Sequence, residues 1–513
     1  MRPIAAPTTM KKISSALALV SLVFCAACGS NGIGGFIGTG NFSNSSLNGT
    51  YVYQVTGWAF GTGNAVQYSE AGIFTANGSG TITSATDDVA EETTGGVSTA
   101  TATGTYHVGS DGRGFVTLNF PGGGSTNLDI TLVSSSKMLM IAGDNANATG
   151  IGEKQTSTVL PTTATAFVFK QHSVSTTQDF STVGQFTLAP DGGVTGSADV
   201  NRGGTINGGA GTASPLTLTT PSSFSAPDAT GRGTAKLVEN SGTTNFYYYI
   251  VDANNIRLLT SDTGVVGLGR VEAQTGGPFS VDPLSGKSFA FGSRADDNGG
   301  LGAANTVGSF TASGGAIDSG SLDMVQDDNS FTNIALNAGG TYSPVAANGR
   351  TLVALDTAIP STLQQAFWMV SPSRAFFLTT SDSNDVGKIE DGTADQQQGT
   401  FSNSTVTGQY AFAMDGFDDQ AGAFIDRVGW IQWDGSGGLI WNEDANSSGL
   451  LNSPGPLSGS YSVGSNGRAT ATVNSLSYAN NDIVFYLVSG SDAYMLENDP
   501  GVEINGVMSK QSQ

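Results

Sequence analysis

The chain of 513 residues contains very little cysteine and histidine. Its two cysteines, Cys25 and Cys28, both lie near the N-terminus, so the rest of the chain has no thiol for a disulfide, thiolate catalysis or a zinc-thiolate site. The two histidines, His107 and His172, are too few for a His-based zinc site and make a Ser-His-Asp triad improbable. We therefore expect no metal and no cofactor, and folding that rests on hydrophobic cores.

Charge is also scarce, at 12% of residues, and it is one-sided: 20 Lys and Arg stand against 42 Asp and Glu, a formal net charge of −22. Few charges argue against coiled coils and long solvated helices. An acidic field repels phosphate backbones, so nucleic-acid binding is disfavoured. The 72 Gly residues show no three-residue period, which excludes collagen. What remains abundant is turn-forming and strand-forming material.

The N-terminus predicts export. Lys11 and Lys12 precede an apolar run that is too short to span a bilayer, and small residues follow it. The segment resembles a bacterial lipoprotein signal: Ala26 and Ala27 match the small positions of the lipobox, and Cys28 matches the cysteine that receives diacylglycerol. Cys25 departs from the family, which usually has Leu there.

This resemblance implies a protein exported to the cell envelope and held in a membrane through a lipid on Cys28. Because no Asp follows Cys28, the sorting rule of some bacteria implies the outer membrane. The alternative is an ordinary signal peptide cut before a free Cys28. We assign 1–28 to the signal and 29–46, rich in Gly, Ser and Asn, to a flexible tether. Met10 looks like a better start than Met1.

Two sequence markers recur with one period along the rest of the chain. A Gly-Arg dipeptide carries arginines separated by 119, 118 and 118 residues. An apolar strand ending in Val recurs with steps of 118, 119 and 118. Such regularity predicts four tandem units, at 47–157, 158–277, 278–401 and 402–513. The marker arginines are Arg113, Arg232, Arg350 and Arg468.

Each unit repeats about eight short strands joined by turns, with no helical period. The fold class is therefore all-β, with four antiparallel meanders. Each meander is expected to close into a small eight-stranded barrel, the alternatives being a β-sandwich or a propeller or solenoid arrangement. Opening motifs such as Gly49-Thr50-Tyr51 resemble, loosely, the first strand of calycin-type barrels (lipocalins and avidins). Unit two departs from the pattern at Ala213-Ser214-Pro215, where it carries a longer insertion.

The repeated arginines are the most conspicuous candidate residues. One hypothesis makes each of them a carboxylate-binding group. The other makes them structural, capping a barrel end or pairing with a repeated aspartate. Recurrence in all four units favours the structural interpretation, because one active site rarely needs four copies.

Three further sets of residues are candidates for a site. Aspartates at comparable turns of the four units, and three more that cluster at 415–419 in unit four, offer oxygen ligands for calcium, although no EF-hand loop or nonapeptide repeat accompanies them. Tryptophans of the last unit suggest a sugar-stacking platform, but residues 430 and 433 point to opposite faces of a strand. His107 is expected to be a solvated strand residue. The aspartates are Asp87, Asp88, Asp199, Asp323, Asp415, Asp418, Asp419 and Asp444, and the tryptophans are Trp430, Trp433 and Trp441.

No P-loop, dinucleotide fingerprint or nucleophile elbow is recognisable, and we predict no catalytic residues. The first hypothesis for function is a non-catalytic, lipid-anchored envelope protein that displays tandem β-domains for binding or structural contact. An alternative is a small-ligand carrier with cavities inside the barrels, and another is a polysaccharide-binding or polysaccharide-acting protein. The expected partners are a membrane and an envelope polymer, a protein or a small apolar ligand.

Overall fold

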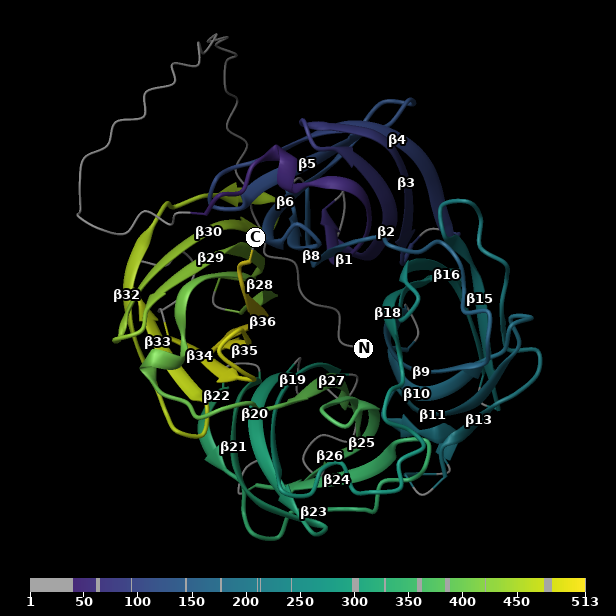
Figure 1. Cartoon of the computed structure of the whole chain (residues 1–513), viewed down its shortest axis with the longest axis vertical. Coiled ribbons are helices and arrows are strands. Elements are labelled where there is room, and N and C mark those ends of the chain that lie inside the picture. The colour runs from purple at the N-terminus through teal and green to yellow at the C-terminus, as the bar shows by residue number, and fades with distance from the viewer. Residues whose placement is uncertain are drawn as a thin grey trace, which may run out of the picture. The chain divides into compact units, whose positions relative to one another are not determined.

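A computed structural model of the chain (Figure 1) describes residues 40–60, 65–93, 95–143, 145–175, 178–209, 211–212, 214–240, 242–297, 304–326, 329–357, 362–382, 388–419, 421–474 and 482–512. Cys28, the signal segment 1–28 and tether residues 29–39 lie outside these ranges. Within them, no helix is long and apolar enough to cross a membrane.

The first unit is a closed barrel of eight antiparallel strands in chain order, with β8 pairing back onto β1. This is the meander that the sequence predicted. Its strands, after the short 3-10 helix η1 (Asn44–Ser46), are β1 (Asn48–Phe60), β2 (Ala65–Asn77), β3 (Thr81–Glu91), β4 (Val97–Val108), β5 (Arg113–Asn119), β6 (Ser125–Ser134), β7 (Lys137–Ala142) and β8 (Ala146–Lys154).

The second unit is an open sheet, a half-barrel, so the expected closure is wrong there. The segment 216–218 pairs with the strand at 194–202, whereas the segment 223–224 pairs with the strand at 232–239. Pro221, which has no N–H to donate to a ladder, lies between the two segments. Its elements are β9 (Thr165–Ser175), β10 (Phe180–Leu188), β11 (Val194–Arg202), β12 (Thr205–Ile206), η2 (Asn207–Gly209), β13 (Leu216–Leu218), β14 (Ser223–Phe224), β15 (Arg232–Glu239), β16 (Gly242–Asp252), β17 (Asn255–Thr260) and β18 (Val265–Ala273).

The third unit closes through pairing of β20 with β21, and β22 adds to the outside of β21. The barrel prediction is therefore confirmed here too. Its strands are β19 (Lys287–Asp297), β20 (Ala304–Ser313), β21 (Ala316–Gln326), β22 (Asn329–Ala335), β23 (Thr341–Tyr342), β24 (Arg350–Asp356), β25 (Thr362–Ser371), β26 (Arg374–Asp382) and β27 (Lys388–Gln396).

The fourth unit repeats the design of the third, closing through β29 and β30. Its elements are η3 (Asn403–Thr405), β28 (Thr407–Asp418), β29 (Ala423–Asp434), β30 (Gly438–Ser447), β31 (Leu450–Asn452), β32 (Leu457–Val463), β33 (Arg468–Val473), β34 (Asp482–Leu487), β35 (Asp492–Glu497) and β36 (Val502–Lys510).

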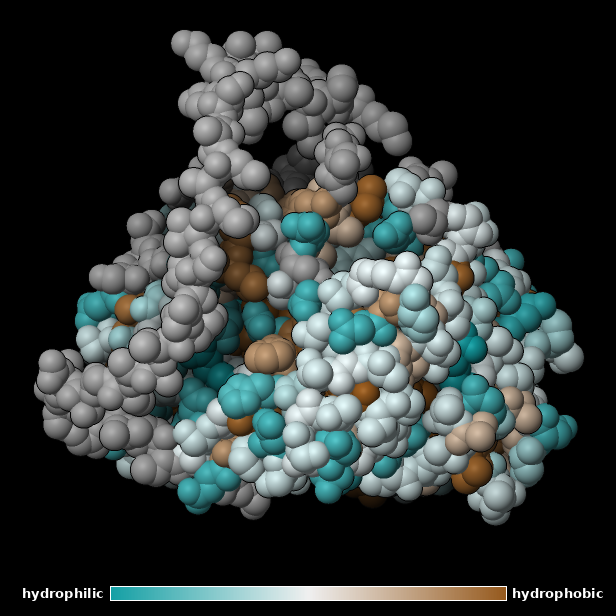
Figure 2. Space-filling model, turned by 90° about the horizontal axis from the view of Figure 1, so that it is seen from above, coloured by the Kyte–Doolittle hydropathy of each residue, from teal (hydrophilic) through white to brown (hydrophobic). Residues whose placement is uncertain are grey.

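Each unit has its own core, built by the alternation of side chains along its strands. In β1, Tyr51 and Tyr53 point inward and stack near Phe74, with ring centroids 5.6 and 5.9 Å away. In the third unit Phe367 and Phe377 stack at 4.9 Å. Aromatic side chains thus fill the interiors, as is usual for small eight-stranded barrels. On the side shown in Figure 2, the described surface is mostly polar, with hydrophobic residues scattered.

Candidate functional site

The marker arginines each reach across to a neighbouring unit. Arg468 donates from Nε and Nη2 to the two carboxylate oxygens of Asp323, at 2.7 and 2.6 Å. The same two-pronged contact joins units two and one, units three and two, and units one and four. The contacts therefore form a closed cycle of four units. The pairs are Arg232–Asp88, Arg350–Asp199, Arg468–Asp323 and Arg113–Asp444.

The glycine before each arginine makes this geometry accessible. Gly112, Gly231, Gly349 and Gly467 have φ angles between +85° and +91°, the left-handed region that other residues avoid. The turn ends with the arginine as the first residue of its strand, β5, β15, β24 or β33. The tight turn thus makes the arginine the first residue of its strand and places its guanidinium at the junction with the neighbouring unit.

The second sequence marker lies directly opposite the first. In register, Arg232 pairs with Tyr249, Arg350 with Trp368 and Arg468 with Tyr486. These three aromatic residues donate a hydrogen bond to the same aspartate as their arginine; Tyr486 reaches Asp323 at 2.7 Å.

Hydrogen bonding and burial both shift the pKa values of these groups. The Asp323 side chain has no exposed surface and Arg468 keeps only 17%. The hydrogen bonds that Arg468 donates to Asp323 raise the pKa of Arg468, and burial raises the pKa of Tyr486 well above its ordinary value. In unit one, Thr131 stands opposite Arg113, and Asp444 keeps 14% exposure. Asp444 therefore has no aromatic donor opposite its arginine, and this Arg–Asp pair is less buried than the other three.

A third repeated residue escaped the sequence analysis. After the last strand of each unit, a glutamine donates from Nε2 to two backbone carbonyls of the next unit in the cycle; Gln397 reaches Asn466 at 3.0 Å and Leu487 at 2.8 Å. Gln511 does the same to Asp111 and Leu132 of unit one. The sequence pattern that could have revealed these residues is a glutamine that recurs directly after the last strand of each unit. The four are Gln155, Gln274, Gln397 and Gln511.

Hydrophobic clusters seal the same four junctions. The outward side chains of the opening strands pack against the Val-ended strand of the neighbour, as Val52 does against Tyr249 and Val251. The residue after each glutamine adds a backbone hydrogen bond to that valine; Ser512 N–H donates to the Val133 carbonyl at 2.8 Å. Equivalent clusters join units two and three, three and four, and four and one.

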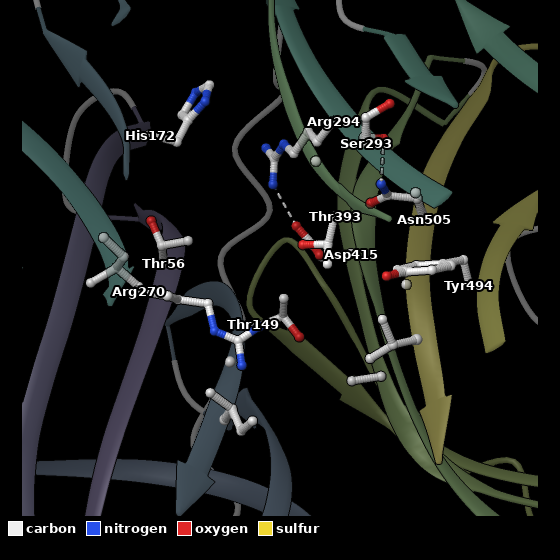
Figure 3. A pocket seen from close by; sticks show the side chains of 18 of the residues that line it. Thr56, Thr149, His172, Arg270, Ser293, Arg294, Thr393, Asp415, Tyr494 and Asn505 are labelled. Atoms are coloured by element: carbon white, nitrogen blue, oxygen red, sulfur yellow. Dashed lines mark hydrogen bonds and ion pairs between the residues drawn. The ribbon is translucent and has the colours of Figure 1, made fainter. Parts of the chain in front are cut away.

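A cavity of about 670 Å³ lies where the four units meet (Figure 3). Most of its lining comes from the first and last strands of every unit: β1 and β8, β9 and β18, β19 and β27, β28 and β36. Because side chains alternate, the residues beside the inward aromatics of these strands face the cavity. Its volume lies in the usual range for a small-molecule site.

The cavity collects basic groups in a chain that is strongly acidic overall. Its charged lining comprises Lys137, Lys170, Arg270, Arg294 and Arg374 against Asp391, Asp395, Asp415 and Asp492. Figure 3 shows Arg294 of unit three bridging to Asp415 of unit four, at 2.6 Å. Charges from different units thus meet inside it.

Asp391 is the most heavily contacted of these acids. Lys170 Nζ and His172 Nδ1 lie 2.8 Å from its two oxygens, and Ser181 Oγ donates at 2.7 Å. Burial opposes its ionisation, but the charge of Lys170 and the bond from His172 outweigh burial and hold the pKa of Asp391 well below its usual range. His172 and Ser181 both bind the aspartate rather than each other, so this is not a nucleophilic triad.

Other candidates from the sequence lie elsewhere. Asp88, Asp199, Asp323 and Asp444 are the arginine partners, and Asp87 is buried with the Tyr53 hydroxyl 2.7 Å away. Asp415 is the Arg294 partner, and the Asp418 carboxylate accepts from the Ala421 amide. The Asp419 amide donates to the Gly501 carbonyl. Among described residues no group of three His, Cys, Asp or Glu is placed to hold a metal.

The tryptophans do not form a platform. Trp433 and Trp441 belong to the core of unit four, with 1% and 0% exposure. Trp430 is buried and donates from Nε1 to Asp111 of unit one, at 2.9 Å. His107 is exposed on β4.

No protein-family model matches the sequence, and the search of curated proteins found no match. Among solved structures, the chain is similar to intact Ap-TbpB with its N and C lobes, at 9% identity and a TM-score of 0.17, covering 75% of this chain and 86% of that one. It is also similar to transferrin binding protein B of Haemophilus parasuis Hp5, at 8% identity and 0.17, covering 73% and 83%. The isotype 1 protein of serogroup B Neisseria meningitidis matches at 9% and 0.18, covering 78% and 84%. TM-scores this low carry no conclusion about function.

Proposed function

We propose that this chain is a non-catalytic binding protein in which the four units act as one body, with a single ligand site where they meet. The observation that carries this proposal is the closed cycle of equivalent Arg–Asp junctions around one cavity. Four repeated arginines are thereby used to hold units together, in keeping with a structural role. The residues that vary between units face the cavity instead.

The position of the cavity favours a ligand between the barrels over ligands inside them. Stacked aromatic rings occupy the barrel interiors, and the core residues of each unit are nearly all fully buried. The cavity, in contrast, presents both hydroxyls, such as those of Thr56 and Thr149, and apolar groups, such as Leu268. Mixed linings of this kind are typical of small-molecule sites.

The polar cluster around Asp391 is built for contact between units rather than for catalysis. In the cluster of Ser181, His172 and Asp391, the aspartate lies in the middle, so His172 cannot take a proton from Ser181. Ser181 is also buried beneath that aspartate. Such an arrangement fixes the junction between units two and three.

We place this binding protein in the cell envelope, exported and anchored through a lipid on Cys28, with the outer membrane favoured. The support is the lipobox-like sequence before Cys28 and the Gly-rich, Ser-rich and Asn-rich stretch at 29–46. A tethered body with a buried ligand site suits the capture of a small molecule at a membrane.

Native mass spectrometry of the full chain, purified from an exporting host, tests the proposal. We expect one additional small-molecule mass per chain, because the four units share one cavity. The matched variant is Gln511→Ala, which weakens the junction between units four and one and is expected to lower the occupied fraction. Several ligand masses per chain would indicate barrel carriers, and a bare chain would contradict a small-molecule site.

A further inference from the structure

One cross-strand pair in each unit faces the cavity at the same position, and the second unit differs from the others. The first strand and the last strand of each unit are paired there. In three units neither residue is charged, whereas the second unit has two cations. The pairs are Gln54–Ile151, Lys170–Arg270, Gly292–Thr393 and Ala413–Val507, and all eight residues line the cavity.

Two like charges directly opposite each other in a sheet destabilise it. Lys170 is compensated, because it donates to Asp391 of unit three at 2.8 Å. Arg270 is compensated only in part: its Nε is buried and has no hydrogen-bond partner, and its closest carboxylate in the described structure, that of Glu272, lies 3.9 Å from Nη2. The junctions do not require an arginine there, since the other units manage with Ile151, Thr393 and Val507.

The acids around Arg270 are already engaged. Arg374 of unit three donates to both oxygens of Glu272, at 2.9 and 3.3 Å, and to Asp395 at 2.9 Å. Glu153 of unit one accepts from Arg257 Nε at 2.8 Å. Arg270 therefore has donors facing the cavity that no neighbouring carboxylate satisfies.

A second cation near Arg270, Lys137, also lacks a carboxylate partner among the described residues. Lys137, on β7 of unit one, lines the cavity and forms no side-chain hydrogen bond or ion pair with any described residue. Burial lowers the pKa of Lys137, and the charge of Arg270 lowers it further. Burial and the charge of Arg257 likewise lower the pKa of Arg270. The protein thus keeps two incompletely compensated cations close together.

We infer that Arg270 and Lys137 bind the oxyanion group, a carboxylate or a phosphate, of a small organic molecule in the cavity. The planar guanidinium of Arg270 supplies paired donors for such a group, and Lys137 adds a compact charge from the neighbouring unit one. Thr149 and Tyr494 also face this part of the cavity (Figure 3). This inference rests on the proposed function, whose site it specifies chemically.

The test is calorimetric titration of the full chain with inorganic phosphate and with succinate, at an ionic strength held constant with chloride, and with glycerol as a neutral probe. We expect at least one of the two anions to bind, one per chain, and glycerol not to bind. Arg270→Met and Lys137→Met are each expected to weaken that binding at least tenfold. Phosphate binding alone would assign a phosphate ligand, and succinate binding alone a carboxylate.

The control is Lys236→Met. Lys236 is half-buried like Lys137 but lies on β15 and does not line the cavity, so its replacement should leave the affinity unchanged. A second measurement needs no variant: the bound anion should protect Lys137 from acetylation, read by peptide mass spectrometry.

The inference is overturned if neither anion binds the wild-type chain, if both variants keep its affinity, or if acetylation of Lys137 is indifferent to the anion. A chain that carries one neutral ligand in native mass spectrometry and ignores both anions would keep the proposed function and remove this inference. A bare chain that binds neither anion would remove both.

Discussion

Arg468, at the start of β33, donates two hydrogen bonds to the carboxylate of Asp323 on β21. Asp323 belongs to the preceding unit and lies 145 residues earlier in the chain. Tyr486, the register partner of Arg468 on β34, donates to the same carboxylate. One aspartate therefore receives three hydrogen bonds from its neighbour. This relationship, repeated with variations around the cycle, makes four barrel-like units into one body.

Replacing Arg468 with alanine should destabilise the chain. The substitution leaves the fully buried Asp323 without its cation, and breaking a buried pair in this way costs about 3 kcal/mol. Urea denaturation followed by circular dichroism measures the loss. Lys236→Ala, which removes a cation outside the junctions, should leave the free energy of unfolding nearly unchanged. If Arg468→Ala changes it as little as Lys236→Ala does, Arg468 does not stabilise the junction.

Replacing Gln511 with alanine should loosen the junction between units four and one. The side chain loses hydrogen bonds to the carbonyls of Asp111 and Leu132, worth about 1 kcal/mol each. The Ser512 amide, bonded to Val133, should then exchange its hydrogen faster. Gln397→Ala is the matched comparison. Because the chain links units three and four covalently, hydrogen exchange at the Gln398 amide, which is bonded to Val488, should accelerate less. A Ser512 amide that already exchanges freely in the wild type would contradict the prediction.

The stability of unit four should depend on pH through a buried glutamate. Burial raises the pKa of Glu497 to about 7, although Arg427 donates to it at 2.7 Å. Since the folded-state pKa lies above the ordinary value of 4.5, this group contributes its full stability below about pH 4.5 and loses it as the pH rises through 7.

The difference between wild type and Glu497→Gln isolates this contribution. The wild-type chain should lose up to about 3 kcal/mol relative to the variant between pH 4.5 and 7. Chemical denaturation at a series of pH values measures it. Parallel stability curves for the two proteins would show that Glu497 does not titrate in this range.

Replacing Cys28 with serine should abolish lipid attachment, because the thiol is the group that takes the lipid in a lipobox. Growth with labelled palmitate, followed by gel separation, shows whether the protein is labelled. Cys25→Ser is the control and should keep the label. A Cys28→Ser variant that still incorporates palmitate rules out the lipobox.

The sequence predicted the barrels because the inward residues repeat. Aromatic pairs such as Tyr51 and Tyr53, or Phe167 and Phe169, recur at each opening strand, and the Gly-Arg turns mark the period. The open second unit was signalled only as a departure at Pro215. In the structure the ladder is interrupted between the segments 216–218 and 223–224, where Pro221 has no N–H to donate.

The junctions could be predicted only in part. Recurrence favoured a structural role for the arginines, but it left open whether each one caps a barrel end or pairs with a repeated aspartate. That Arg350 and Trp368 are register partners aimed at Asp199 depends on how two sheets pack. The repeat pattern could not predict the cavity, because the residues that line it, Arg270 among them, occupy positions where the four units differ.

The central claim is that the four units close into a cycle, and the junction between units one and four decides it because the chain does not link them. A double-mutant cycle with Arg113→Ala and Asp444→Ala, read by chemical denaturation, measures the contact directly. We predict a coupling free energy of about 1–3 kcal/mol between the two sites. Fully additive effects would mean that Arg113 and Asp444 do not meet and that the cycle is open.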